Sequence, residues 1–112
     1  MNMSGLGIDI SEVSRFKTFK KNSRFVLNNY NRREIDYCFN FKDPGPHLAG
    51  IFSAKEAVFK AMKNPSLVLL SIEIRPAQNG RPEVWIKDRR KTAILVSISH
   101  VAMAAVAVAI KK

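Results

Sequence analysis

The chain has 112 residues, of which 46% are hydrophobic and 25% charged, and its net charge is +10. This composition excludes a disordered segment, and we expect a single domain over residues 1–112. Cys38 is the only cysteine, which excludes an intrachain disulfide and a thiolate metal cluster and favours a cytoplasmic protein. Asp9 and Glu12 interrupt the apolar run that a secretion signal needs, and the apolar stretch 101–110 is far shorter than the ~20 residues of a membrane-spanning helix. We therefore expect a soluble protein.

A short strand and then a helix are predicted at the start of the chain. Residues 6–10 have the composition of a strand. Ser11 could cap a helix over residues 12–21, because apolar side chains recur at helical spacing from Val13 onwards.

This first helix opens a strongly basic segment. Seven basic side chains occur there without an acidic one: Arg15, Lys17, Lys20, Lys21, Arg24, Arg32 and Arg33. A solvated surface explains any one of them, but the run as a whole favours an acidic partner, such as a nucleic acid, an anionic membrane or an acidic protein.

Two more helices are predicted before the middle of the chain. A short one covers residues 33–39, and the breaker sequence Asp43-Pro44-Gly45-Pro46 follows it. The longest helix should cover residues 47–63, where apolar side chains form a stripe, and Asn64-Pro65 should end it.

The rest of the chain is predicted to form strands. A hairpin turn is expected at Asn79-Gly80. The strands around it and after it are expected at residues 67–74, 83–87, 92–98 and 103–110. Helices first and an antiparallel meander afterwards predict an α+β fold, with an antiparallel sheet packed against one long and two shorter helices. The last strand is entirely apolar and should be buried on both faces, covered either by the helices or by a second subunit.

Two carboxylates and a lysine are candidates for a metal and phosphate site. Asp9 lies between two isoleucines, where a buried carboxylate needs a partner. Taken alone, the position favours an ordinary strand-end Asp that faces water or caps the next helix. Glu56 and Lys60 are one helical turn apart, a common surface pair, but Glu56 also lies beside phenylalanines. Carboxylates from two segments can hold Mg²⁺, which completes its coordination with water and phosphate.

Two later segments could contact phosphate. The segment Ser97-Ile98-Ser99-His100 ends a predicted strand, where hydroxyls, an imidazole and backbone N–H groups can converge on an anion. It does not predict a serine hydrolase, because the G-x-S-x-G motif is absent. Arg81 follows the Asn79-Gly80 turn and could either reach a phosphate or belong to a plain hairpin.

Four motifs follow one another along the chain: Gly7-Ile8-Asp9-Ile10; Ala49-Gly50 with Ser53-Ala54-Lys55-Glu56-Ala57 and Lys60; Asn79-Gly80-Arg81-Pro82; and Ser97-Ile98-Ser99-His100. From about residue 6 to residue 110 this series resembles the holo-acyl-carrier-protein synthase family, the short 4′-phosphopantetheinyl transferases. The resemblance implies the fold of those transferases. It also implies transfer of phosphopantetheine from coenzyme A to a serine of an apo carrier protein, with release of adenosine 3′,5′-bisphosphate.

The same resemblance implies roles for individual residues. Asp9 and Glu56 would hold Mg²⁺ against the pyrophosphate of coenzyme A, Lys60 would stabilise the phosphates or the leaving group, and Glu56 or a metal-bound water would accept the serine proton. Arg15 would dock the acidic carrier protein, and members of the family are homotrimers with sites at subunit interfaces. The residues expected to contact coenzyme A are Lys60, Asn79, Gly80, Arg81, Pro82, Ser99 and His100.

The chain departs from the family pattern at three places. Ile51 stands where the family usually has a phosphate-contacting arginine, Met62 and Lys63 follow Ala61 where a glycine is common, and Val101 replaces a small hydroxyl residue. These departures affect the expected contacts to coenzyme A, and Lys42 or Lys63 could compensate for the contacts that are lost. The metal ligands stay in place.

Two alternative functions follow from these features. The first is a relative that binds carrier protein or coenzyme A but no longer transfers, as Ile51 suggests. The second is a basic nucleic-acid-binding module, in which aromatic side chains between residues 16 and 30 would stack on bases. The helical spacing of these aromatic residues fits a protein core better than an exposed surface.

Overall fold

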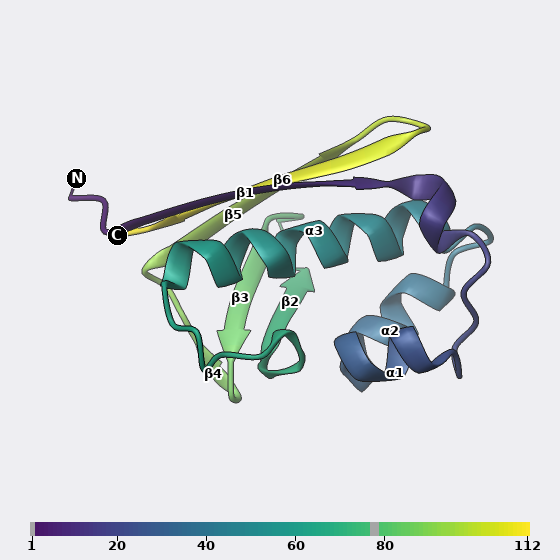
Figure 1. Cartoon of the computed structure of the whole chain (residues 1–112), viewed down its shortest axis with the longest axis horizontal. Coiled ribbons are helices and arrows are strands. Elements are labelled where there is room, and N and C mark those ends of the chain that lie inside the picture. The colour runs from purple at the N-terminus through teal and green to yellow at the C-terminus, as the bar shows by residue number, and fades with distance from the viewer. Residues whose placement is uncertain (1, 77–78) are drawn as a thin grey trace.

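A computed structural model of the chain describes residues 2–76 and 79–112. The elements in chain order are β1 (Gly5–Glu12), the 3-10 helix η1 (Val13–Phe16), α1 (Arg24–Asn29), α2 (Arg32–Phe39), α3 (Gly45–Met62), the 3-10 helix η2 (Leu69–Ser71), β2 (Ile72–Pro76), β3 (Pro82–Ile86), β4 (Arg89–Arg90), β5 (Ile94–His100) and β6 (Ala104–Lys111). The long helix α3 lies between two layers: β1, β5 and β6 cover one side, and β2, β3, β4, α1 and α2 lie on the other (Figure 1). Within the described ranges, no helix combines the length and hydropathy that crossing a membrane requires.

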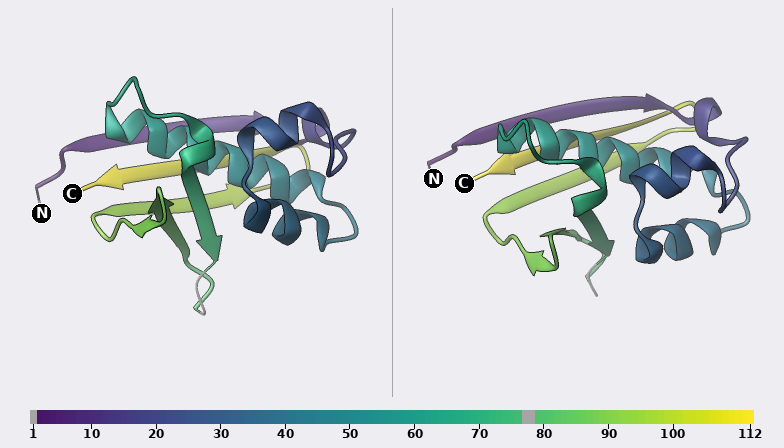
Figure 2. Two further views of the ribbon diagram at one scale, coloured as in Figure 1. Left: turned by 90° about the horizontal axis from the view of Figure 1, so that it is seen from below. Right: turned by 60° about the horizontal axis from the view of Figure 1, so that its bottom comes forward.

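The α+β fold class is confirmed, and the described residues form two antiparallel sheets of three strands each. The first has the order β1-β6-β5, so that the two ends of the chain pair with each other, and the second has the order β2-β3-β4 (Figure 2). The strands therefore do not follow one another as a single meander. The apolar strand β6 takes the central place in its sheet, where both of its edges are hydrogen-bonded.

Small residues bring β1 and α3 close together. A Cβ atom added at Gly7 would lie 1.9 Å from the carbonyl oxygen of Ala57, and one added at Gly5 would lie equally close to that of Ala61. Only glycine allows a helix backbone to approach a strand so closely. This packing places Asp9, which follows Gly7 by two residues on the same face of β1, against α3.

The prediction of a helix over residues 12–21 is wrong. The strand β1 continues through Glu12 because its backbone pairs with β6 as far as Ala104, and only the short η1 follows. Ser11 is therefore a strand residue and not a helix cap, and its hydroxyl accepts a hydrogen bond from Ser53 over 2.7 Å. The apolar spacing that suggested a helix places Val13 and Phe16 in the core from η1 instead.

The other predicted elements lie close to their expected positions. The helices expected at 33–39 and 47–63 are α2 and α3, and the turn at Asn79-Gly80 connects β2 to β3, with Gly80 at a φ of +80°. The later strands are shifted by a few residues. Within the predicted strand 67–74, residues 69–71 form η2, so that β2 starts only at Ile72.

In the single chain, only one face of β6 is buried, and not both as predicted. Its three fully buried alanines face α3, whereas the side chains between them are partly exposed. The neighbouring strand β1 presents Leu6, Ile8 and Ile10 on this outer face, with exposed fractions of 57%, 61% and 71%. The outer face of the sheet is therefore an open apolar surface.

Candidate active site

Asp9 lies on the side of β1 that packs against α3, and its side chain is only 17% exposed. The Ser11 hydroxyl lies 3.5 Å from one of its carboxylate oxygens, and the Lys60 ammonium lies 3.5 Å from the other. Asp9 is thus neither a strand-end residue that faces water nor a helix cap. It is a mostly buried carboxylate held between two elements.

Lys60 connects α3 to β1. Its Nζ donates a hydrogen bond of 2.9 Å to the carbonyl oxygen of Ile8 and lies beside Asp9. Among the described residues, its ion pair is therefore with Asp9 rather than with Glu56 one turn earlier. About half of the Lys60 side chain remains exposed, so its charge can still be shared with a ligand.

Glu56 shares an electrostatic environment with Asp9. The pKa of the Glu56 carboxyl is raised, first by its partial burial and then by the negative charge of Asp9, while Lys60 and Arg15 act in the opposite direction. A carboxylate whose ionisation is disfavoured by a neighbouring carboxylate is stabilised when a cation binds beside it. Glu56 also lines an open depression between α1, α3 and η2, so its carboxylate is accessible from outside.

This carboxylate pair fits a hard divalent cation such as Mg²⁺. Mg²⁺ is usually bound through one or two carboxylates, with water and substrate phosphate at its other positions. Within residues 2–76 and 79–112, no group of three or more His, Cys, Asp or Glu side chains could hold a metal. Two carboxylates from separate elements suit an open site that water and substrate phosphate complete.

The later motifs meet at a separate groove of about 550 Å³. Gly80, Arg81 and Pro82 line it from the β2–β3 connection, and His100 lines it from the end of β5. Asn79 lies instead on a neighbouring groove that shares Arg81 with this one.

Ser99 is not part of either groove among the described residues. It lies opposite Val106 on the outer, exposed face of the β1-β6-β5 sheet. The structure thus brings the turn and His100 together within one chain and leaves Ser99 on the open apolar face.

The residue Ile51 also lines the groove and is almost fully buried. It therefore contributes apolar surface and no charge. Of the two lysines considered as compensation, Lys42 is not among the residues that line the groove, and Lys63 lies beyond the opposite end of α3. The cationic side chains of the groove are Arg81 and, when protonated, His47 and His100.

Arg15 is held on aromatic rings next to the carboxylates. Its guanidinium lies 5.3 Å, 5.0 Å and 5.3 Å from the ring centroids of Phe16, Phe25 and Phe52. Its positive charge also opposes the rise in the pKa of Glu56, so the guanidinium lies near that carboxylate. The rings pack against one another, and Phe16 is fully buried, which fits a core and not a platform for stacking bases.

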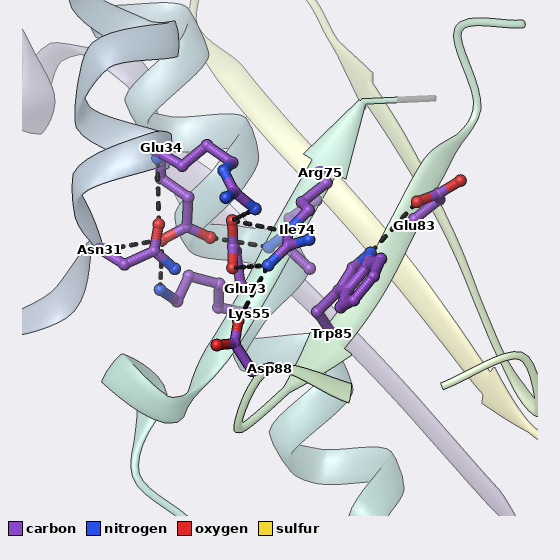
Figure 3. Close-up of polar contacts among 10 residues, drawn as sticks. Asn31, Glu34, Lys55, Glu73, Ile74, Arg75, Glu83, Trp85 and Asp88 are labelled. Carbon is purple, nitrogen blue, oxygen red and sulfur yellow. Dashed lines mark hydrogen bonds and ion pairs between the residues drawn. The ribbon is translucent and has the colours of Figure 1, made fainter. Parts of the chain in front are cut away.

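A buried ion pair behind the site escaped prediction from the sequence. The Lys55 ammonium lies 2.6 Å from Glu34, and neither side chain is exposed (Figure 3). The Glu34 carboxylate also accepts hydrogen bonds from the backbone N–H groups of Asn31 and Ile74. The spacing Asn31-x-x-Glu34 is that of a capping box, and this box forms at the start of α2. The contact of Glu34 with Asn31 therefore had a signal in the sequence. Nothing local indicates the partner on α3.

A second polar cluster supports the hairpin that carries Arg81. Glu73 on β2 lies 2.8 Å from Arg75 and 3.4 Å from Arg33 of α2. The Arg75 guanidinium stacks over the ring of Trp85 at 3.7 Å (Figure 3). These contacts join β2, β3 and α2, which fixes the hairpin against the helices.

Comparison with known proteins gives consistent matches over almost the whole chain. The model of the 4′-phosphopantetheinyl transferase superfamily matches residues 5–110. A holo-[acyl-carrier-protein] synthase of Thermodesulfovibrio yellowstonii is 42% identical over 101 residues, which cover 88% of each chain. The fatty acid synthase subunit alpha of Candida albicans is 34% identical over 96% of this chain, which is 6% of that protein.

Solved structures match in the same way. A holo-(acyl-carrier-protein) synthase from Bacillus anthracis in complex with CoA (3′,5′-ADP) has a TM-score of 0.81 and 29% identity, and the match covers 97% of this chain and 96% of that one. The Helicobacter pylori holo-[acyl-carrier-protein] synthase in complex with coenzyme A has a TM-score of 0.75 and 28% identity, covering 96% and 99% of the two chains.

Proposed function

Because the chain belongs to the 4′-phosphopantetheinyl transferase superfamily, we propose that it is a holo-acyl-carrier-protein synthase. It transfers 4′-phosphopantetheine from coenzyme A to a serine of an apo acyl carrier protein and releases adenosine 3′,5′-bisphosphate. The names of its relatives and the coenzyme A complexes of similar structures support this reaction. The observation that carries the proposal is the Asp9–Glu56 carboxylate pair with the Lys60 ammonium beside it.

In this proposal Asp9 and Glu56 hold Mg²⁺, which when bound neutralises and orients the pyrophosphate of coenzyme A. The serine oxygen forms a bond to the β-phosphorus, and the bond from that phosphorus to the bridging pyrophosphate oxygen breaks. Lys60 stabilises the negative charge on the phosphate oxygens. Glu56 or a metal-bound water would accept the serine proton. Arg81, His100, the rest of the Asn79–Pro82 turn and Ser99 complete the contacts to coenzyme A.

The carrier protein docks on the basic side of the molecule, through Arg15. Its guanidinium is ordered by the aromatic rings and lies near Glu56, so an acidic partner held there would present its serine to the carboxylate pair. These partners suit the cytoplasmic setting that the single cysteine favours.

Copies of the chain associate as a homotrimer through the open face of the β1-β6-β5 sheet. Leu6, Ile8 and Ile10 expose a contiguous apolar surface that is costly in water. Association would also place Ser99, which lies on this face, next to a neighbouring subunit. A coenzyme A site shared between subunits explains why one chain does not bring Ser99 into the groove with His100.

Intact-protein mass spectrometry tests the reaction. An acidic apo acyl carrier protein incubated with the chain, coenzyme A and Mg²⁺ should gain the mass of one phosphopantetheine, and EDTA should prevent the gain. Asp9→Asn and Glu56→Gln should both abolish it while circular dichroism shows an intact fold. A variant that retains full activity would refute its assignment as a metal ligand.

The alternative of a catalytically lapsed relative is favoured by one observation, the apolar Ile51 in the groove. Calorimetry distinguishes the two functions, because a lapsed relative binds coenzyme A or carrier protein but gives no product with any carrier protein tested. In that case Ile51→Arg is the first substitution to make.

A further inference from the structure

Two buried hydroxyls connect β1 to α3 behind the carboxylate pair. Ser53 of α3 is fully buried, and Ser11 of β1 is only 7% exposed. Their oxygens lie 2.7 Å apart, which is a short hydrogen bond between two hydroxyls. A buried hydroxyl needs such a partner, because leaving it unpaired is costly. The reaction proposed above uses neither side chain.

The two hydroxyls lie in line with the proposed metal ligands. Ser53, Glu56 and Lys60 follow one another at intervals of three and four residues, so they form one stripe along α3. Asp9 and Ser11 are two residues apart on β1 and project from the same face of that strand. Ser11 contacts both Ser53 and Asp9, and it therefore lies between the helix and the carboxylate.

The Asp9 carboxylate sets the direction of these hydrogen bonds. An ionised carboxylate only accepts, so the Ser11 hydroxyl, which lies 3.5 Å from its Oδ2, is the donor in that contact. Ser11 then accepts from Ser53, whose hydroxyl donates over 2.7 Å. Hydrogen bonds in such a chain polarise and strengthen one another. The contact of 3.5 Å is long, as hydrogen bonds to catalytic groups often are before the ligands bind.

We propose that Ser11 and Ser53 are positioning residues that orient the Asp9 carboxylate for the divalent cation. This inference rests on the proposed function. Oδ1 of Asp9 lies beside the Lys60 ammonium and Oδ2 beside the Ser11 hydroxyl, so each oxygen has a fixed neighbour. A carboxylate held in this way loses little rotational freedom when a cation binds to it. Groups that hydrogen-bond to a metal ligand typically contribute about 10-fold to 100-fold to metal affinity.

Binding of Mn²⁺ tests the proposal without turnover, because Mn²⁺ suits the same oxygen ligands as Mg²⁺ and free Mn²⁺ is measured by electron paramagnetic resonance. The titration is made with coenzyme A but without carrier protein, and coenzyme A alone is the blank. Ser11→Ala should weaken Mn²⁺ binding by roughly tenfold. Ser11→Thr keeps the hydroxyl and should bind nearly as the unmodified chain does. Ser11→Val, which has the shape of Ser11→Thr but no hydroxyl, should bind as Ser11→Ala does.

Ser53 acts through Ser11 in this arrangement. Ser53→Ala should weaken Mn²⁺ binding by a smaller factor than Ser11→Ala, and the double variant should bind no worse than Ser11→Ala alone. Ser4→Ala removes an exposed hydroxyl just before β1 and should leave Mn²⁺ binding unchanged. Thermal melts establish that each variant is folded.

Two results would overturn the proposal. In the first, Ser11→Val binds Mn²⁺ as Ser11→Thr does, which would reduce the hydroxyls to a packing contact between β1 and α3, whatever the melting temperatures. In the second, the losses from Ser11→Ala and Ser53→Ala add in the double variant, so that Ser53 does not act through Ser11. Failure of the unmodified chain to bind Mn²⁺ would instead refute the Asp9–Glu56 metal site of the proposed function, and the positioning role with it.

Discussion

Removing one partner of the buried Glu34–Lys55 pair should destabilise the protein strongly. Lys55→Met keeps the length of the side chain but leaves the Glu34 carboxylate buried without its counter-charge. Breaking a buried pair in this way typically costs about 3–5 kcal/mol. The stability of a whole domain is only about 5–15 kcal/mol, so the variant should lose a large part of it.

The loss should depend on pH in a defined direction. Burial raises the pKa of Glu34, and Lys55 is the main influence that lowers it, through its charge and its hydrogen bond. Without Lys55, the folded-state pKa rises further above the unfolded value, so the folded variant binds a proton that the unfolded chain releases. Its free energy of unfolding is then highest at low pH and falls as the pH rises from about 4.5 through the folded-state pKa.

A second substitution separates the charge from the packing. Glu34→Gln in the Lys55→Met background removes the buried charge and keeps an oxygen for one of the two N–H groups, since those of Asn31 and Ile74 donate to different oxygens of Glu34. The double variant should therefore be more stable than Lys55→Met alone at neutral pH, with little pH dependence.

Urea unfolding followed by circular dichroism, at fixed protein concentration, measures these differences. The reasoning would be refuted by a cost below about 1 kcal/mol for Lys55→Met at neutral pH. A cost that stays constant between about pH 5 and about pH 8 would refute it as well, because a buried unpaired carboxylate must titrate.

Three further predictions concern packing, association and catalysis. Gly7→Ala should destabilise the fold severely, because the added Cβ would meet the carbonyl oxygen of Ala57. Gly80→Ala should cost only about 1 kcal/mol, for the positive φ of this residue, because its added Cβ would meet no other atom. Similar melting temperatures for the two variants would contradict this prediction. Ile10→Glu should shift sedimentation from an oligomer to a monomer by placing a charge on the apolar sheet face, and an unchanged sedimentation coefficient would exclude that face as the interface. In the metal-free chain the pKa of Glu56 is raised, so protons should compete with Mg²⁺ for this carboxylate and the Mg²⁺ concentration that gives half-maximal transfer should rise as the pH falls. A Mg²⁺ requirement that stays constant from neutral pH to about pH 5 would argue against Glu56 as a ligand.

The elements whose signals are local could be predicted from the sequence. The helices α2 and α3 are bounded by a capping residue and by proline, and their apolar spacing is helical. The turn at Asn79-Gly80 follows from residues that tolerate its backbone conformation. The order of four short motifs also indicated the family, and with it Asp9, Glu56 and Lys60 as members of one site.

Only the tertiary structure decided how these pieces meet. The segment after Ile10 has helical spacing, but pairing of β1 with β6, which lies at the other end of the chain, keeps it extended through Glu12. The partner of Lys55 is a glutamate on another helix, and the partner of Lys60 is Asp9 across the sheet interface, not the glutamate one turn away. These contacts depend on where two glycines let β1 approach α3 and on which strand takes the centre of the sheet. Such choices are made by packing between distant segments, and a local pattern of residues carries no information about them.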